Sequence, residues 1–363
     1  MKRTPLFQPF ITMREFRLVK KVLRSRSLSR GPFVEEFEKE FAKFTGRRYA
    51  VAVSSGTCGL DLCLKALDIT KNDAVITSAY SFVASTNCIL YQGAKPVFCD
   101  VHQKNGLINI NQVKKNISSK TRAILPVDIF GQTCNLSELN KLGLPIIVDS
   151  CESFGAPIQP GALANVYGFY PNKQITTGEG GMIVTDSKDF ADKLRSLRNQ
   201  GFKNTKNYLD EITLGFNFRM SDINAAMGIA QLKNASRILK KRKTAALKYS
   251  KLLNKLSGIQ PIYDANNPNI SVFNYPVTCK SSAIRNSIIL EFQKNNIEYS
   301  LGFPPLIAFR YIRQATDMNF NDFPSCKSFA NHLLCLPMFT SISKRQIKRV
   351  VKAIKKGLAN ATN

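Results

Sequence analysis

The sequence predicts an α/β protein with a large domain, built on a mostly parallel sheet flanked by helices, and a smaller carboxyl-terminal α/β domain. A chain of 363 residues is longer than one hydrophobic core usually serves. Short β-rich runs alternate with helical patterns over the first two-thirds, which is typical of parallel βαβ units. The composition then changes to Asn- and Pro-containing turns at residues 264–269. We therefore expect domains at residues 1–250 and 251–363.

The first part of the chain carries the signals for the large sheet. Pro32 begins a predicted helix whose phenylalanines form one apolar stripe: Phe33, Phe37, Phe41 and Phe44. RYAVAVSS is then a predicted strand that leads through Gly56 into the helix TCGLDLCLKAL. Further strands are predicted at DAVITS, KPVFCDV, RAILPVDIF, LPIIVDS and GGMIVTD, which begin at residues 73, 95, 122, 144 and 180.

A long helix is predicted from Ser221, its N-cap, to about Leu253. The smaller domain follows, with a strand in SVFNYPV, a helix over residues 282–295, the segment IEYSL and a terminal helix. The terminal run SKRQIKRVVKAIKKGL, which begins at Ser343, has apolar residues at helical spacing and basic residues on the other side. We interpret it as a packed helix with a solvated basic side; a membrane or nucleic-acid surface is the alternative.

Composition limits the classes of function. The 52 Lys+Arg against 25 Asp+Glu give a net charge of +27, which favours polyanionic partners, but the charge is spread along the chain. Nine cysteines without paired C-x-x-C spacing are expected to be buried hydrophobes in a reducing compartment. Two histidines nearly exclude a histidine-rich zinc site, and no metal is expected. Without a membrane span or secretory signal, a soluble cytoplasmic protein is expected.

Three short segments carry candidate chemistry. SSGT, at residues 54–57, joins a strand to a helix and offers backbone N–H groups and the Thr57 hydroxyl to an anion, although it also fits a simple turn. In LPIIVDSCESFGA, a continuous apolar strand ends at Asp149, where open α/β sheets present groups to a ligand; helix capping is the alternative. Lys173 lies before a glycine-rich turn. An uncharged lysine amine can form an imine with an aldehyde, although most lysines are surface charges.

Together these motifs resemble the DegT/DnrJ/EryC1/StrS family of sugar aminotransferases, within the fold-type I pyridoxal-phosphate enzymes of the aspartate aminotransferase superfamily. The similarity runs in one register from about Pro9 to Leu253, through RGPFVEEFEKEFAKFTG, YAVAVSSGTCGLDLCLKAL, FVASTN, GAKPVFCDV, PVDIFGQ, KQITTGEGG, LRNQG and LGFNFRMSDINAAMG. The later LPMFTSISKRQI is similar to the family's closing Leu-Pro segment and terminal helix. The resemblance implies the fold-type I transferase fold with pyridoxal 5'-phosphate as cofactor.

The resemblance also implies roles for individual residues. Lys173 and Asp149 would be catalytic: the lysine forms the Schiff base, and the aspartate binds the pyridine nitrogen of the cofactor. Gly56 and Thr57 would hold its phosphate. The remaining expected cofactor-binding residues are Phe82, Glu152 and Asn217.

Phe82 would lie on the face of the cofactor ring, with an ordinary core aromatic as the alternative. Glu152 stands where many members have a glutamine near the phenolic oxygen, and a carboxylate there alters the proton balance. Asn217 matches an asparagine that reaches the phosphate from the other subunit, whereas Arg219 is equally compatible with a structural role.

Three positions depart from the family pattern. Gly168 stands five residues before the lysine, where the family often has a serine that binds the phosphate. That contact is therefore missing, or backbone, Ser55 or water supplies it. Asp128 replaces a histidine of the PVHxYG segment. Ile307 stands where a histidine is usual in the smaller domain, on the expected substrate side, so the identity of the substrate is most affected.

The implied activity is the transfer of an amino group from an amino acid, with glutamate as the expected donor, to a nucleotide-linked keto-deoxysugar for amino-sugar and polysaccharide biosynthesis. A homodimer with shared active sites is the expected unit. A sugar dehydratase is the first alternative, but that branch has a histidine in place of the lysine. A non-catalytic DNA-binding or membrane-bound regulator is the second, although no helix-turn-helix or zinc-binding pattern is present and no specific nucleic-acid partner is expected.

Overall fold

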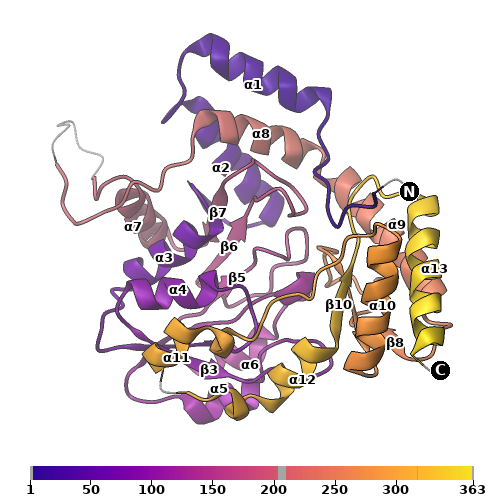
Figure 1. The fold of residues 1–363 in the computed structure, drawn as a ribbon. Helices are drawn as coiled ribbons and strands as arrows, with labels where there is room; N and C mark the ends of the chain where they lie inside the picture. Colours follow the sequence, from indigo (N-terminus) through magenta and orange to yellow (C-terminus); the bar gives the residue numbers. More distant parts are fainter. Residues whose placement is uncertain (1–2, 203–209, 317, 362–363) are drawn as a thin grey trace.

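The computed structural model describes residues 3–202, 210–316 and 318–361, and its centre is a twisted sheet (Figure 1). The strands are β1 (Tyr49–Val53), β2 (Ala74–Ser78), β3 (Lys95–Cys99), β4 (Thr121–Leu125), β5 (Ile147–Asp149), β6 (Ala164–Gly168) and β7 (Gly181–Thr185). The ladders β3-β2-β4 and β5-β6-β7-β1 are joined by parallel bridges from Ile124 to Ile146 and from Val127 to Asp149. Within this sheet, β7 is antiparallel to both of its neighbours, and the other pairings are parallel. The predicted mostly parallel sheet is confirmed.

Helices cover both faces of the sheet. One face carries α3 (Gly56–Ala66), α4 (Ala84–Tyr91) and α7 (Lys188–Arg198). The other carries α1 (Met13–Ser25), α2 (Pro32–Thr45) and α8 (Asp222–Lys233) at one end, and α5 (Ile110–Asn116) and α6 (Leu136–Asn140) at the other. Strand β1 shows why both faces are apolar: Val51 packs towards α3, whereas Ala50 and Ala52 pack towards α2.

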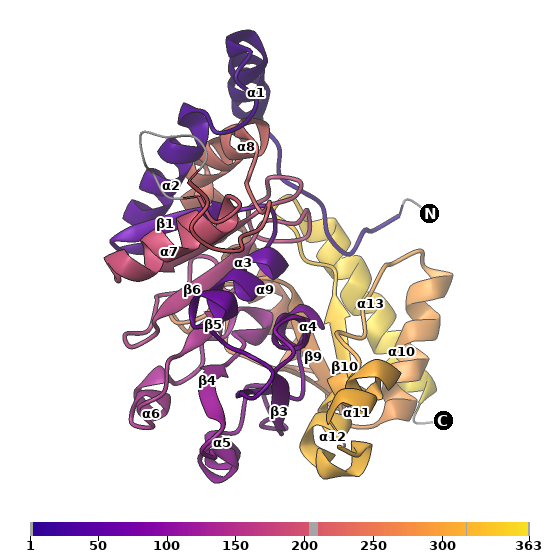
Figure 2. The same ribbon diagram turned by 90° about the vertical axis from the view of Figure 1, so that its left-hand side faces the viewer.

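The carboxyl-terminal part forms a second, antiparallel sheet of β8 (Ile259–Pro261), β9 (Tyr275–Cys279) and β10 (Leu333–Leu336). It shares an apolar core with α9 (Ala235–Leu253), α10 (Ser282–Lys294) and α13 (Lys344–Asn360). Figure 2 shows α10 and α13 at the right-hand side of the molecule, whereas α1 lies at its top. The terminal helix has the predicted packing and begins at Ser343 with a capping box to Gln346.

The segment between β9 and β10 reaches back to the large sheet. It contains α11 (Arg310–Thr316), α12 (Pro324–His332) and the short turns η2 (Leu306–Ala308) and η3 (Phe320–Asp322). Leu306, Phe323 and Phe329 lie in the same core as α3 and α4, whereas the core of the small sheet contains residues from Ala245 onward. The expected division into residues 1–250 and 251–363 stays a prediction.

Several local predictions were wrong. The helix expected from Ser221 to Leu253 is two helices, because the chain turns at Asn234, whose side chain bonds to Thr12 and Arg14 at the start of α1. Strand β6 was not predicted. The strand expected from residue 271 begins only at Tyr275, and IEYSL makes two isolated bridges. Phe44, the last residue of the predicted apolar stripe, is half-exposed. Its ring stacks on that of Phe154, with the ring centres 5.0 Å apart.

All nine cysteines lie in the described ranges as free thiols, seven of them buried. Burial and packing, rather than crosslinks, therefore account for their places in the fold. No helix in the described part of the chain is long and apolar enough to cross a membrane.

Candidate functional site

A cavity of about 420 Å³ lies where β5 and β6 end and α3 begins, within the usual size range of small-molecule pockets, about 300–1,000 Å³. The carboxyl ends of parallel strands are where open α/β sheets bind ligands. Segments far apart in the sequence line the cavity: Ser55, Gly56, Thr57, Leu60, Phe82, Ala84, Val127, Ile129, Asp149, Cys151, Glu152, Gly168, Phe169, Tyr170, Asn172, Lys173, Glu179, Gly180 and Phe303.

Asp149 is the last residue of β5 and is 6% exposed. The Ser85 hydroxyl donates to its Oδ2 at 2.7 Å, and the Cys151 backbone N–H donates to its Oδ1 at 3.1 Å. Both carboxylate oxygens are therefore held, one from α4 and one from the turn after β5. A carboxylate fixed in this way can hold a cationic ring nitrogen in the cavity.

Lys173 lines the same cavity as Asp149, and its side chain is 16% exposed. Its Nζ is 3.6 Å from Oε1 of Glu152 and 4.5 Å from the centre of the Phe273 ring. Glu152 is buried, and its Oε2 accepts the backbone N–H of Phe130 at 2.8 Å. Burial raises the pKa of Glu152 above its ordinary value, and the nearby lysine opposes that effect.

The amino-terminal end of α3 meets the cavity. Ser55 is the N-cap: its Oγ accepts the Cys58 N–H at 3.1 Å and keeps its own hydroxyl proton to donate. Gly56 and Thr57 are the first two helical residues, so their backbone N–H groups point out of the helix. Together with the helix dipole, these donors form a place for an anion.

Close packing around this helix end explains the glycine at position 168. A Cβ built on Gly168 would lie 3.2 Å from the Cys151 sulfur, and one built on Gly56 would lie 2.7 Å from it. The Cys151 sulfur thus lies in tight contact with the place that a Cβ at position 168 would take. The serine that the family often has there does not fit beside this cysteine without a shift.

Aromatic side chains stand at the mouth of the cavity. Phe82 is 55% exposed, and its ring centre lies 5.7 Å from that of Phe303. Tyr170, which also lines the cavity, is 51% exposed. Phe82 is therefore not an ordinary core aromatic, since its face is open to a ligand.

The structure brings six of the predicted site residues together around this cavity: Gly56, Thr57, Phe82, Asp149, Glu152 and Lys173. Asn217 does not line it; the residue is exposed and makes a backbone bridge with Asn199. The Arg219 guanidinium donates to the Asn199 side chain at 2.8 Å, outside the cavity.

Two of the departures from the family pattern lie away from the cavity. Ile307 is 1% exposed in the core beside α3 and α4, so the expectation that it faces the substrate was wrong. The carboxylate of Asp128 points behind the sheet, where it accepts from the hydroxyls of Ser150 at 3.0 Å and Ser153 at 2.8 Å and from the Cys134 N–H at 2.9 Å. It ties together the turn that carries Glu152.

Four residues of the site were missed from the sequence: Ser85, Cys151, Asn172 and Phe273. Ser85 lies within FVASTN, and Asn172 directly precedes the lysine, so both stood in motifs that were noticed. The Asn172 Oδ1 is buried and has no hydrogen-bond partner among the described residues, which leaves an acceptor at the cavity wall. Phe273 gave no local signal, since it comes from the carboxyl-terminal part.

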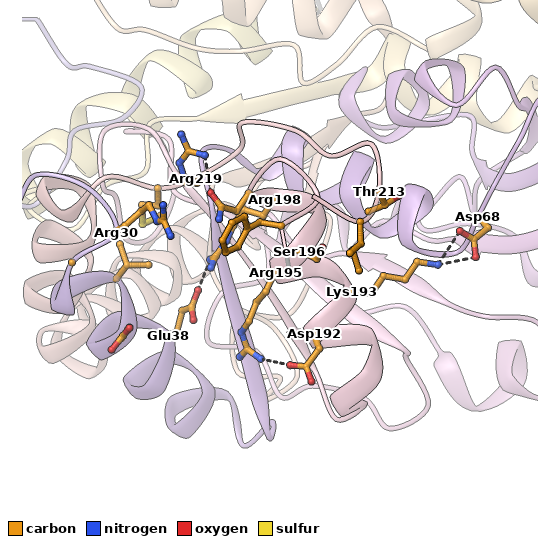
Figure 3. A pocket seen from close by; sticks show the side chains of 17 residues that line it. Arg30, Glu38, Asp68, Asp192, Lys193, Arg195, Ser196, Arg198, Thr213 and Arg219 are labelled. Atoms are coloured by element: carbon orange, nitrogen blue, oxygen red, sulfur yellow. Dashed lines mark hydrogen bonds and ion pairs between the residues drawn. The ribbon is translucent and has the colours of Figure 1, made fainter. Parts of the chain in front are cut away.

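A second hollow of about 1,100 Å³ lies between α2, α7 and residues 212–220 (Figure 3). Most of its ionic side chains pair with one another, as the dashed lines show: Arg198 with Glu38, Arg195 with Asp192, and Lys193 with Asp68. Although this hollow is larger, none of the described residues that line it is a lysine whose amine lies beside a buried carboxylate. The smaller cavity is therefore the candidate active site.

Comparison with known proteins agrees with this geometry. The profile of the DegT/DnrJ/EryC1/StrS aminotransferase family matches residues 9–355. The GDP-perosamine synthase of Vibrio cholerae is 31% identical over 369 residues, covering 97% of this chain and 98% of that protein. The spore coat polysaccharide biosynthesis protein SpsC of Bacillus subtilis is 31% identical over 375 residues, covering 97% and 96%.

Solved structures give the same result. Helicobacter pylori PseC, an aminotransferase involved in the biosynthesis of pseudoaminic acid, is 26% identical with a TM-score of 0.92, covering 99% of this chain and all of that one. DesV of S. venezuelae is 26% identical with a TM-score of 0.91 over the whole of both chains. The expected fold, enzyme class and cofactor are confirmed. The chain belongs to the DegT/DnrJ/EryC1/StrS aminotransferase family and is a pyridoxal-phosphate-dependent sugar aminotransferase.

Proposed function

We propose that this aminotransferase moves the amino group of glutamate to the keto group of a nucleotide-linked deoxysugar, for the biosynthesis of amino-sugar polysaccharides. One observation supports this most strongly. A single cavity holds a lysine amine, a carboxylate fixed by two hydrogen bonds, and the amino-terminal end of a helix. These are the three groups that amination through pyridoxal phosphate requires.

The residues present fit the cofactor. The first turn of α3 offers N–H donors to its phosphate, Asp149 faces the cavity as a fixed anion, and the Asn172 Oδ1 is a buried acceptor without a partner in the described chain. When bound, pyridoxal phosphate supplies an electron sink that stabilises negative charge on the reacting carbon of the substrate.

The chain's own groups then have separate tasks. Lys173 Nζ would hold the cofactor through its aldehyde carbon and, once a substrate amine has taken that place, would serve as the general acid and base that carries the proton. Asp149 would pair with the protonated pyridine nitrogen, because Ser85 and the Cys151 N–H keep its carboxylate in place. The Glu152 carboxylate lies 3.6 Å from the amine and would orient it.

Phe82 and the helix end orient the ring. The exposed face of Phe82 at the cavity mouth can stack on an aromatic ring. The donors of Ser55, Gly56 and Thr57 would hold the phosphate of the cofactor, beside the Cys151 sulfur that lies against Gly168.

The substrate class is inferred from the relatives. The names of two relatives point to nucleotide sugars, GDP-perosamine synthase and the UDP-4-amino-4-deoxy-L-arabinose–oxoglutarate aminotransferase of Shewanella sediminis, which is 28% identical. Oxoglutarate is the keto acid of glutamate, which supports glutamate as the donor here.

A panel of nucleotide-linked keto-sugars, incubated with glutamate and the purified protein, tests this proposal. We expect formation of 2-oxoglutarate and of one amino sugar, in equal amounts and by ping-pong kinetics. Amination of a free keto-sugar but of no nucleotide-linked one would reject the substrate class. If 2-oxoglutarate forms only when another keto acid, and no keto-sugar, is the amino acceptor, sugar amination would be rejected.

We also propose that the active unit is a homodimer in which Asn217 completes the partner's site. Asn217 is exposed and lies outside the cavity of its own chain. In the same segment, Ile212 is 59% and Leu214 is 80% exposed, an apolar surface that a second copy can cover.

Mixed dimers test the shared site. Lys173→Ala and Asn217→Ala are each expected to be severely impaired, and the two proteins are then unfolded, mixed and refolded. Random pairing makes about half of the dimers mixed, and each mixed dimer has one site without either lesion, so roughly a quarter of the wild-type activity returns. If mixed dimers form and no activity returns, Asn217 acts within its own chain.

A further inference from the structure

The positive charge is concentrated at one end of the molecule. Residues 235–363 contain 21 Lys+Arg and 5 Asp+Glu. Helices α9 and α13 together hold fourteen of these basic residues and no acidic residue. They lie side by side, since α13 packs against both α9 and α10. Residues 235–363 therefore carry +16 of the net charge of +27, and residues 1–234 carry the other +11.

Twelve of the fourteen side chains are exposed, and we call them the basic face: Arg237, Lys240, Lys241, Lys243, Lys248, Lys251, Lys344, Arg345, Lys348, Lys352, Lys355 and Lys356. The other two serve the fold: Arg242 is buried and donates to the carbonyls of Val272 and Phe273, and Arg349 donates to that of Asn295. Within the described residues, no member of the basic face forms an ion pair with an acidic side chain.

Helical spacing places the exposed basic residues of each helix on one side of that helix. The exposed basic residues recur every three or four positions, so each helix presents one stripe. The opposite stripes, with Ile238 and Tyr249 of α9 and Ile347, Val350 and Ile354 of α13, are buried in the core of the small sheet. Because the apolar sides are already packed, the helices cannot insert into a hydrocarbon layer. Any partner of this surface is held by charge.

Like charges on neighbouring helices repel one another, so a surface without acidic residues disfavours the folded chain unless a polyanion lies against it. Active-site phosphates do not explain it, because none of the twelve residues lines the cavity. We propose that the basic face docks the enzyme onto a membrane surface rich in anionic lipids. Clusters of about four to eight Lys and Arg residues are typical of such surfaces.

The composition of the face favours lipid over nucleic acid. Ten of the twelve residues are lysines, which are mobile point charges suited to a diffuse layer of headgroups, whereas arginine is favoured for bidentate contacts to phosphates and bases. Neither helix exposes an aromatic side chain on which a base could stack, because the one aromatic residue of α9, Tyr249, is buried.

The test is sedimentation of the full-length holoenzyme with vesicles of neutral phosphatidylcholine, or of phosphatidylcholine with about 30% phosphatidylserine, at about 0.1 M salt. We expect at least about tenfold stronger binding to the anionic vesicles, lost at about 0.5 M salt. Equal binding to both vesicles, or none to either, would overturn the proposal. Tighter binding to a DNA duplex than to anionic vesicles at the same salt would assign the face to nucleic acid instead.

Two variants with the same change in net charge distinguish binding through the basic face from binding through net charge alone. The first carries Lys348→Glu, Lys352→Glu, Lys355→Glu and Lys356→Glu on α13. The control carries Lys71→Glu, Lys104→Glu, Lys115→Glu and Lys120→Glu at exposed positions of the large sheet's end. The first should lose at least about tenfold in vesicle binding and the control less than about threefold, with unchanged aminotransferase activity in both. Equal losses would attribute binding to net charge and overturn the proposal.

If the glutamate variant of α13 fails to fold, the same four lysines are changed to glutamine, which removes charge without adding repulsion. A clear loss of binding with an unchanged melting temperature supports the basic face. Unchanged binding in that variant counts against it.

Discussion

Around the cavity, the buried carboxylates of Asp149 and Glu152 lie with the amine of Lys173, whereas on the basic face twelve exposed cationic side chains have no acidic partner among the described residues. Each of these three cavity groups has a neighbour at a defined distance. On the basic face, all the charges are positive. In the cavity, the function therefore depends on the position of each charged side chain. On the basic face, it depends only on the total positive charge.

This difference follows from the solvent. A charge taken out of water is stabilised only by well-placed partners, so loss of one partner has a large effect. An exposed charge is screened by water and salt, so loss of one lysine changes little. Single substitutions in the cavity and on the basic face should therefore differ in effect by orders of magnitude.

The largest effect is expected from Asp149→Asn. The amide cannot stabilise a proton on the pyridine nitrogen as the carboxylate does, so kcat should fall by about 10²–10³-fold while the fold and some cofactor remain. Steady-state kinetics and absorbance of the bound cofactor measure this. Lys352→Asn on the basic face is the control and should keep wild-type kcat. Near-normal turnover in Asp149→Asn would remove this carboxylate from the mechanism.

The next effect concerns stability and pH. Burial raises the pKa of Asp128 from 3.8 to about 6, although hydrogen bonds from Cys134, Ser153 and Ser150 oppose it. The folded chain thus binds this proton more tightly than the unfolded chain does. The contribution of Asp128 to the free energy of unfolding is complete below pH 3.8 and falls by about 3 kcal/mol as the pH rises through 6.

Asp128→Asn removes this titration. Denaturant unfolding at pH 4, 5, 6 and 7 should show a difference between wild type and variant that changes with pH in that direction. Asp189→Asn, at an exposed position in α7, is the control and should show no such change. A constant difference between wild type and Asp128→Asn across the range would contradict the burial of a titrating carboxyl behind the sheet.

A tenfold effect is expected at the helix end. Gly168→Ser brings its side chain against the Cys151 sulfur, and overpacking of this kind costs about 1–3 kcal/mol of folding stability. Because Cys151 also packs against Gly56, a shift of the sulfur moves the helix end that would bind the phosphate, so the apoenzyme should bind pyridoxal phosphate about tenfold more weakly. Adding Cys151→Ala makes room for the serine hydroxyl and should restore binding. Absorbance titration measures both. Equal affinities of the single and double variants would show that the sulfur does not occupy that space.

The smallest effect in the cavity is expected from Glu152→Gln. The amide oxygen can still accept the Phe130 N–H, and the family often has glutamine here, so kcat should stay within about threefold of wild type. Because burial raises the Glu152 pKa, the wild-type rate should change as this carboxyl gains its proton on acidification, and the variant should lack that change. The pH profile of kcat checks this. An identical profile would remove Glu152 from the proton balance.

Much of this site could be predicted from local sequence. Asp149 ends a continuous apolar strand, and SSGT begins a helix after another strand, so both follow from the geometry of parallel sheets. Ser85 could not be assigned in this way, because it is 64 residues from the carboxylate that it holds. Ile307 was misplaced because its neighbours in sequence resemble a substrate-binding segment, whereas the fold buries it in the core that also contains residues of α3 and α4.

The fold shows the same limit. The phenylalanine stripe of α2 and the short apolar strands were readable because their periods are local. The break at Asn234 could not be predicted from local sequence, because it depends on contacts with Thr12 and Arg14 at the start of α1. The basic face could not be read either, since its two helices are 90 residues apart and only packing brings them together.

Lys173 is the residue that we expect to bind the cofactor covalently. The holoenzyme, expected to be yellow, is reduced with borohydride, digested, and mapped by mass spectrometry. We predict one modified peptide, which contains Lys173, and none in Lys173→Ala, although 52 Lys and Arg residues crowd this chain. A protein that stays colourless with added pyridoxal phosphate, or a cofactor fixed to another lysine while Lys173 is unmodified, would contradict the account.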